Sequence, residues 1–382
     1  MNETTLFPLV SPKHLSKQWL EELLSYDLGH SVKITEWTVK SPEVRNGYLS
    51  EIGFVRVKFI SSEEKETCPR TEKSVSLVLK CMPKEPSQLE IVRKLDLARC
   101  EVDFYKYTKS EEFTTFCKKS DLSHPVPKLF WGGQKNEVFT IVLQDLSTRN
   151  FRVVIEPEGN TLEQLKCILS SIAIIHAAGL ATLSRHGHHC FNFPRKKCIM
   201  IENVRAGIKR QIKMFAGSRI ASTLEALLTK VVDLINVASR YPLLNTLIHN
   251  DLWTGNVMIN QDDTTASIID WQFVRLGNPV CDIITLLFLS GKPSAYQQHL
   301  TELLNCYWNK FEQAMKKNNV PVSITYEQLM RNAEDMYIYG YMIASSVPEY
   351  FLSVNTYTEK RTKHIVNYLF ETGHFKKFLA YI

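Results

Sequence analysis

This sequence of 382 residues has little of what marks secreted, membrane or nucleic-acid-binding proteins. Its nine cysteines are odd in number, widely spread and form no C-x-x-C pair, a pattern that predicts reduced thiols in a cytoplasmic protein. The N-terminal residues show no charged segment followed by an apolar one, so we expect no signal peptide. Basic residues are scattered among acidic ones and the formal net charge is only +6, which predicts no nucleic-acid partner.

Long apolar runs are also missing, apart from one stretch. Residues 167–183 are the most apolar part of the chain, but they include serine, threonine and His176, and their length only just matches a bilayer. We therefore expect a core helix there and no membrane span. No internal repeat, low-complexity tract or long linker is visible, and nothing in the sequence indicates an oligomeric state.

The sequence changes character near residue 147. The chain is too long for one compact core, so two domains are expected. Before residue 147, short β-rich runs predict strands at residues 32–39, 52–59, 75–81 and 138–144. After it, apolar residues recur at helical spacing, for example over 162–175 and 326–343. The pattern predicts an α+β fold with a sheet-rich N-terminal lobe, residues 1–146, and a mostly helical C-terminal lobe, residues 147–382.

The stretch LIHNDLWTGNVMIN, residues 247–260, places His249, Asp251 and Asn256 in an otherwise apolar run. A buried carboxylate without partners costs several kcal/mol or becomes protonated, so these residues require a partner or a function. Apolar strands are predicted over 247–249 and 267–270, and the second ends in Asp270. Mg²⁺ prefers oxygen ligands, usually one or two carboxylates completed by water and phosphate. Asn256 and Asp270 fit that set.

The spacing of these residues narrows the interpretation. Asp251 and Asn256 are five positions apart, the D-x-x-x-x-N interval of kinase catalytic loops, and Asp270 follows at the end of the next strand. In that arrangement Asp251 accepts or orients the proton of an acceptor hydroxyl, while Asn256 and Asp270 bind metal ions. We take Asp251 and His249 as the candidate catalytic residues. The alternative is that Asp251 caps a turn with Asn256 at its tip, which is common for either residue alone.

A phosphotransferase of this kind also needs residues that bind the nucleotide. Lys80 lies near the end of a predicted strand, where the lysine that binds the α- and β-phosphates belongs, and Glu101 lies on a predicted helix 21 residues later. A Lys80–Glu101 pair would fix the lysine, although a plain surface charge is the alternative for Glu101. There is no glycine-rich loop. Gly47 at a turn, and Ser50 with its backbone and hydroxyl, are the phosphate-binding candidates in its place.

Seven short segments occur in an order that resembles a known family: NGYLSEI, LVLKCMP, CEVDFY, VLQDL, IAIIHAAG, LIHNDLWTGNVM and IIDWQFVRLGNPVCDI. The chain resembles the ecdysteroid kinase-like (CHK kinase-like) family of the aminoglycoside and choline phosphotransferase superfamily. The resemblance implies a two-lobed protein-kinase-like fold and ATP-dependent phosphorylation of a hydroxyl on a small molecule, with ecdysteroids as the known substrate class. By position, it assigns Asp251 as catalytic, Asn256 and Asp270 as metal ligands, and Lys80 with Glu101 as the pair that binds phosphate. It also implies a hinge that reads adenine at Gln144, Asp145 and Leu146.

Two positions depart from this pattern. The family usually has glycine where Asn250 stands and glutamate where Gln144 stands, but neither change removes a required charge, so we expect activity. A protein kinase is the nearest alternative. However, the 12 positions from Asp270 to Asp282 lead directly into an apolar helix and leave no platform for a peptide. The same residues also fit a nucleotide-binding scaffold without turnover, or a kinase of another small alcohol such as choline.

The acceptor site is predicted from residues 333–351, which are helical by periodicity. Tyr337 and Tyr341 lie four positions apart and therefore on one face of that helix. Such a face is usually plain core. An aromatic, partly polar wall also suits a rigid lipophilic alcohol such as a sterol, so we expect both tyrosines to line the site of a small hydroxylated substrate. ATP and Mg²⁺ are the expected cofactors.

Overall fold

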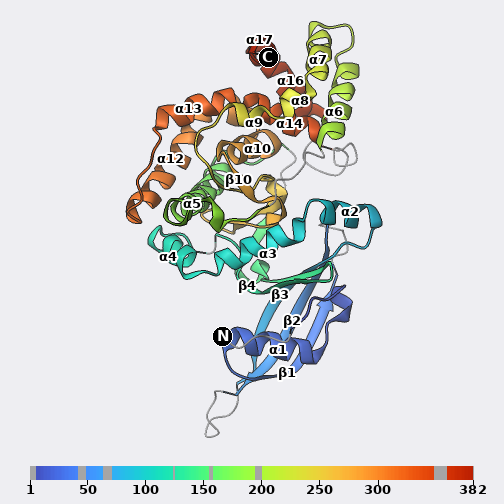
Figure 1. Ribbon diagram of the computed structural model, residues 1–382, viewed down its shortest axis with the longest axis vertical. Helices are drawn as coiled ribbons and strands as arrows, with labels where there is room; N and C mark the ends of the chain where they lie inside the picture. The colour runs from blue at the N-terminus through green and yellow to red at the C-terminus, as the bar shows by residue number, and fades with distance from the viewer. Residues whose placement is uncertain are drawn as a thin grey trace. The chain divides into compact units, whose positions relative to one another are not determined.

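The computed structural model describes residues 6–41, 49–62, 71–123, 125–154, 158–193, 200–347 and 359–381 (Figure 1). The chain divides into two compact units. The first unit consists of Met1–Thr114, Val126–Phe151 and Asp270–Gln272. The second consists of Thr115–Pro125, Arg152–Ile269 and Phe273–Ile382. Asp270–Gln272 thus belong to the first unit, although the chain on both sides of them belongs to the second. The domain boundary between residues 146 and 147 stays a prediction.

The first unit is built on a five-stranded antiparallel sheet with the strand order β1-β2-β3-β5-β4 (Figure 1). Its strands are β1 (Val32–Lys40), β2 (Glu51–Ser61), β3 (Lys73–Cys81), β4 (Leu129–Lys135) and β5 (Val138–Gln144). Side chains along β2 alternate between buried and exposed, as expected for a strand with one face on a core. The four predicted strands are confirmed to within two residues. β4 was not predicted, because two adjacent glycines interrupt its short apolar run.

The helices of the first unit are η1 (Pro12–His14), α1 (Lys17–Leu28), α2 (Pro86–Lys94) and α3 (Leu97–Thr108). α1 begins where the Ser16 hydroxyl accepts a hydrogen bond from the Trp19 N–H, and it ends at Gly29 in the left-handed conformation. Its apolar face packs into a core formed with the sheet, in which Trp19 meets Trp131 edge to face. α3 buries one side, and the Glu101 side chain is on that side.

The second unit is mostly helical. Its helices are α5 (Leu162–His186), α6 (Met200–Met214), α7 (Arg219–Thr229), α8 (Val231–Ile235), α9 (Val237–Arg240), α10 (Val280–Ser290), α11 (Pro293–Gln297), α12 (Leu300–Lys317), α13 (Tyr326–Asp335), α14 (Tyr337–Ser346), α16 (Glu359–Glu371) and α17 (His374–Tyr381). α4 (Glu111–Lys119) crosses from the first unit into the second. The helical segment expected over 326–343 is two helices, because the chain leaves α-helical geometry at Met336. The α+β class is confirmed.

Short strands interrupt these helices. β7 (Thr246–Ile248) pairs with β10 (Arg275–Gly277), and β6 (Phe151–Val153), β8 (Val257–Asn260) and β9 (Ala266–Ile268) form a three-stranded sheet. We expected apolar strands at 247–249 and 267–270, the second of them ending in Asp270. Both strands exist with their bounds shifted by a residue or two, but they lie in different sheets and do not pair. The η4 turn (Thr254–Asn256) joins β7 to β8.

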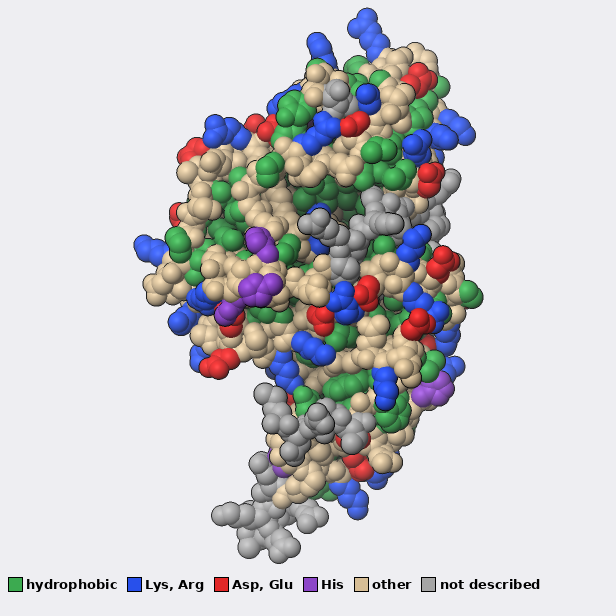
Figure 2. Space-filling view, in the orientation of Figure 1, with side chains coloured by type: hydrophobic (Ala, Val, Ile, Leu, Met, Phe, Trp, Pro, Cys, Tyr) green, Lys and Arg blue, Asp and Glu red, His purple; other side chains and the backbone are tan. Residues whose placement is uncertain are grey.

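α5 is the core helix of the second unit. Among the described helices it is the one that is long and apolar enough to cross a membrane by length and composition, but 83% of its most apolar window is buried inside the fold. That degree of burial is typical of a core helix, as predicted for residues 167–183. On the surface, Figure 2 shows basic and acidic side chains interspersed over the face in view, as their scatter along the sequence suggests.

Candidate active site

Lys80, Glu101 and Asp270 meet in the first unit. Lys80 lies on β3, opposite Ile52 of β2 and Ile141 of β5, so strand pairing on both sides fixes its backbone. Its ammonium nitrogen Nζ lies 2.7 Å from Oε2 and 2.9 Å from Oε1 of Glu101, and it also donates to Oδ1 of Asp270. The Lys80 and Glu101 side chains are buried, and that of Asp270 is 28% exposed. The structure therefore brings together three of the residues predicted from sequence.

The charges of this cluster do not balance. Burial alone would lower the pKa of the Lys80 ammonium, but the charges of Asp270 and Glu101 raise it above its usual value, so the lysine stays positive. Burial raises the pKa of the Glu101 carboxyl. The charge of Lys80 opposes that shift, and a backbone hydrogen bond from Trp271 opposes it further. One ammonium thus faces two carboxyl groups, and the charge of Asp270 also raises the pKa of Glu101, so ionisation of both carboxyl groups would leave an excess of negative charge for a bound cation to neutralise.

Aromatic packing holds the two sides of the cluster together. Trp271 follows Asp270 directly, is fully buried, and stacks on Phe104 of α3 with ring centroids 3.8 Å apart and planes 12° apart. Asp270 itself has a φ of +62°, a left-handed conformation that is uncommon for aspartate. The stack therefore anchors both α3, which carries Glu101, and the turn that carries Asp270.

In the second unit, the loop after β7 carries His249, Asp251 and Asn256. The side-chain amide nitrogen of Asn256 donates to the backbone oxygen of Asp251 at 2.9 Å and to its carboxylate Oδ2 at 3.0 Å. This geometry directs the amide oxygen of Asn256 away from Asp251, and that oxygen is the atom that could ligate a cation. Asp251 is half-buried, so its carboxylate is not sealed inside the fold.

His249 is fully buried and both of its ring nitrogens contact backbone groups. Nδ1 accepts from the N–H of Asp251 at 3.2 Å, which leaves the proton on Nε2, 2.9 Å from the oxygen of Ile269. The ring thus joins the loop after β7 to the end of β9. This arrangement makes His249 a residue that holds Asp251 in place, and its predicted catalytic role stays a prediction.

Asp282, at the first turn of α10, was not predicted as a site residue although it anchors the same loop. Its Oδ2 accepts from the N–H of His249 at 2.6 Å and contacts Nε2 of His176 at 3.1 Å, and its Oδ1 accepts from the N–H of Asn250 at 2.7 Å. Burial alone would raise the pKa of the Asp282 carboxyl, but these partners hold it below its usual value. The other ring nitrogen of His176 lies 2.9 Å from the Tyr307 hydroxyl, so this histidine is a hydrogen-bonded core residue, as expected from its apolar helix.

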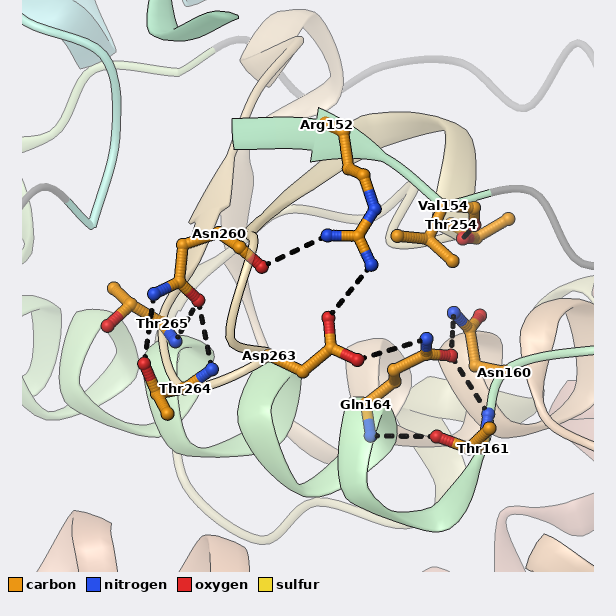
Figure 3. A network of polar contacts seen from close by, with 10 residues as sticks. All are labelled: Arg152, Val154, Asn160, Thr161, Gln164, Thr254, Asn260, Asp263, Thr264 and Thr265. Atoms are coloured by element: carbon orange, nitrogen blue, oxygen red, sulfur yellow. Dashed lines mark hydrogen bonds and ion pairs between the residues drawn. The ribbon is translucent and has the colours of Figure 1, made fainter. Parts of the chain in front are cut away.

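A polar network around the β8–β9 hairpin also supports the loop that carries Asp251 and Asn256 (Figure 3). Asn260 closes the hairpin, because its Oδ1 accepts from the backbone N–H groups of the turn, and Arg152 bridges its backbone oxygen and Asp263. Asp263 in turn accepts from Gln164, which forms a capping box with Thr161 at the start of α5. The network ties β6, β8 and α5 into one frame.

Thr254 connects that frame to the loop. Its backbone N–H donates to the hydroxyl of Ser290 at 2.7 Å, and its own hydroxyl donates to the oxygen of Val154. Thr254 begins the turn that ends at Asn256. The position of Asn256 is therefore set by contacts with α10 and with the segment after β6.

The remaining residues predicted to bind the nucleotide lie at the ends of strands and in turns. Ser50 is half-buried immediately before β2, and Gly47 lies outside the described residues. Gln144 ends β5, and Asp145 caps η2 (Leu146–Arg149) by accepting from the N–H of Ser147 at 3.0 Å. Leu146 is buried. The role of this segment as a hinge for adenine stays a prediction.

Tyr337 and Tyr341 are both buried and each hydroxyl has a partner. Tyr337 donates to the backbone oxygen of Tyr296 at 2.7 Å, and Tyr341 donates to the side-chain oxygen of Gln211 at 2.8 Å. They differ in one respect: Tyr337 lines a cavity of about 460 Å³, whereas Tyr341 packs against Phe375 with centroids 4.8 Å apart. Their contact with an acceptor stays a prediction.

The chain is similar to one protein family and to several solved structures. The sequence matches the model of the ecdysteroid kinase-like family over residues 45–320. No curated protein matches it. Among solved structures, it is similar to a choline/ethanolamine kinase family protein from Mesorhizobium loti, with 14% identity, 90% of this chain and 91% of that chain covered, and a TM-score of 0.45.

A second similar structure is an ethanolamine kinase from Plasmodium vivax, with 10% identity, 97% of this chain and 94% of that chain covered, and a TM-score of 0.41. A third is a macrolide 2′-phosphotransferase type I, with 15% identity, 93% of this chain and 98% of that chain covered, and a TM-score of 0.40.

Within the described residues, no group of three or more His, Cys, Asp or Glu side chains is arranged to hold a metal ion by itself.

Proposed function

The chain belongs to the ecdysteroid kinase-like family, and from this premise we propose that it is an ATP-dependent kinase that phosphorylates a hydroxyl group of a small lipophilic molecule. The observation that carries the proposal is the buried cluster of Lys80, Glu101 and Asp270. Replacing a buried ion pair with an apolar core is often neutral or stabilising, so a buried lysine held by two carboxyl groups favours a binding function over a purely structural one.

In the proposed reaction each group has one task. Lys80, fixed by Glu101, binds nucleotide phosphates, and Asp251 accepts or orients the proton of the acceptor hydroxyl while that oxygen attacks the γ-phosphorus. The bond from the γ-phosphorus to the β–γ bridging oxygen breaks, and ADP leaves. His249 and Asp282 hold Asp251 in place through the contacts described above. Catalysis then rests mainly on positioning and on charge neutralisation.

Mg²⁺ fits the residues that would hold it. Asp270 and the amide oxygen of Asn256 are hard oxygen donors, and Asp270 is 28% exposed, so its carboxylate is not sealed inside the fold. When bound, Mg²⁺ would supply positive charge against the phosphate oxygens. Ser50 is proposed to bind phosphate through its backbone and hydroxyl. Gln144, Asp145 and Leu146 are proposed to contact the adenine, as the family resemblance implies.

For the acceptor we propose an ecdysteroid or another sterol, as the family implies, and the cavity beside Tyr337, which Tyr296 and Tyr368 also line among polar residues, is the proposed place for it. Choline or a similar small alcohol is the alternative. We also propose a cytoplasmic location, because the described cysteines at positions 81, 100, 117, 167, 190, 281 and 306 form no disulfide.

The test is to incubate the purified protein with γ-labelled ATP, Mg²⁺ and a panel of ecdysteroids, other sterols and short amino alcohols, and to measure label transferred to each compound. Lys80→Met is the control variant, since it keeps a buried side chain of similar length without the charge. Transfer to a sterol by the native protein, but not by Lys80→Met, supports the proposal. Thermal stabilisation by Mg²⁺ and ATP without any transfer or hydrolysis would instead indicate a nucleotide-binding scaffold.

A further inference from the structure

Asn250, between His249 and Asp251, has a φ of +65°. This left-handed conformation costs most residues free energy and suits glycine, with asparagine the next most tolerant residue. Two contacts hold it there. Its backbone N–H donates to Asp282, and its side-chain oxygen Oδ1 accepts from Nε of Arg275 at 2.9 Å. The side chain of Asn250 is therefore fixed from outside its own loop.

Arg275 reaches Asn250 because of strand pairing. It begins β10, which pairs with β7 so that Arg275 lies opposite Ile248, two residues before Asn250. A second guanidinium nitrogen, Nη1, lies 3.4 Å from the backbone oxygen of Leu276. Nε and Nη1 thus contact groups within the fold, the Arg275 side chain also bonds to that of Cys281, and these contacts orient the guanidinium without any ligand.

Gly277 leaves the space that this arrangement needs. A Cβ atom at position 277 would lie 2.6 Å from Cδ1 of Ile248 and 2.9 Å from Nη1 of Arg275, both closer than real Cβ contacts. Any side chain there would have to displace the guanidinium of Arg275 and the end of the Ile248 side chain. The glycine, the arginine and the asparagine therefore form one arrangement at the start of the loop.

We propose that Arg275 is a positioning residue for Asp251, acting through Asn250. The left-handed backbone at Asn250 sets the direction of the chain into Asp251, whose own N–H is bonded to His249. Without Arg275 the side chain of Asn250 is free, the turn can relax toward more common backbone conformations, and the Asp251 carboxylate moves. The inference deepens the proposed kinase function, because a misplacement of about 1 Å in such a group can cost up to about 100-fold in rate.

A double-mutant cycle tests this route. We expect Arg275→Ala to lower kcat about 10-fold or more with the KM for ATP changed less than about twofold, and Arg275→Lys to give an intermediate kcat. Asn250→Gly accepts the left-handed conformation but lacks the oxygen that Arg275 contacts. In the Asn250→Gly background, Arg275→Ala should therefore change kcat by less than about twofold. Arg240→Ala, which removes a surface arginine paired with Asp233, is the matched control and should leave kcat unchanged.

Two kinetic results overturn the inference. An unchanged kcat in Arg275→Ala shows that the contact does not position Asp251, even if the variant melts at a lower temperature. An equal loss in the native and Asn250→Gly backgrounds shows that Arg275 acts on the reactants directly.

Hydrogen exchange of the backbone amides over residues 248–252, measured without nucleotide, separates this inference from the proposed function. Exchange about fivefold faster or more in Arg275→Ala and Arg275→Lys supports the positioning role even if the native protein transfers no phosphate. Exchange at the native rate in both variants overturns it.

Discussion

Replacement of Asp282 tests how firmly the loop of Asp251 is anchored. In Asp282→Ala, the backbone N–H groups of His249 and Asn250 and Nε2 of His176 lose their acceptor in a buried place. Each such unpaired donor costs about 1–3 kcal/mol. Since some water can enter, we expect a total loss of about 3–5 kcal/mol, in line with the removal of one partner from a buried charged network. At about 2–4 °C per kcal/mol for a unit of this size, Tm should fall on the order of 10 °C.

The pH dependence follows from the lowered pKa of Asp282. A carboxyl whose pKa is lower in the folded than in the unfolded protein stabilises the fold above its unfolded pKa, near the usual value of 3.8. That contribution is lost as the pH falls through the folded pKa. The difference in Tm between the native protein and Asp282→Ala should therefore be constant from pH 7 to about 5 and shrink below about pH 4.

Thermal melts of both proteins across this pH range are the assay. Asp282→Asn is the conservative variant, and it should lose less because its amide oxygen can still accept from the backbone. Asp335→Ala, which breaks a surface pair with Lys377, is the control and should cost less than about 1 kcal/mol. A Tm for Asp282→Ala within about 2 °C of native, or a difference that stays constant down to pH 3, would refute the reasoning.

Three further predictions concern packing, metal and acceptor. Gly207→Ala would place a Cβ 1.8 Å from a backbone oxygen of α14 and should lower Tm strongly, whereas Gly132→Ala, with its nearest atom at 3.5 Å, should not. Asp270→Ala should raise the Mg²⁺ concentration needed for stabilisation by ATP about tenfold or more, as titrated melts will show. Tyr337→Ala or Tyr341→Ala should raise the KM for the acceptor but not for ATP. If a variant has a lower Tm but an unchanged KM for both acceptor and ATP, the tyrosine it replaces belongs to the core.

The sequence predicted the parts of the site that depend on local pattern. Lys80 could be placed on a strand from alternation, Glu101 on a helix from periodicity, and their pair is present. Asp251 and Asn256, five positions apart, bond to each other within one loop, and their catalytic and metal-binding roles stay predictions. Each of these inferences needs only a few neighbouring residues.

What could not be predicted depends on contacts between distant segments. Asp282 bonds to His176, which is 106 residues away, and it lies on a helix so uniformly apolar that no face is distinguished. The partner of the Tyr341 hydroxyl comes from α6, so the sequence around Tyr341 could not show that this phenol is satisfied inside the fold. The strands before Asp251 and Asp270 lie in different sheets, which the sequence could not show for the same reason, because the partner of a short strand is set by distant segments.

The most direct test of the central claim is to separate binding from transfer in Asp251→Asn. We expect this variant to bind Mg²⁺ and ATP within about threefold of the native affinity, while phosphate transfer to the acceptor falls by about 10²- to 10⁴-fold. Asp262→Asn, at an exposed turn position of the same unit, is the matched control and should transfer phosphate at the native rate. An Asp251→Asn variant that keeps more than about a tenth of the native kcat would contradict the catalytic role of Asp251.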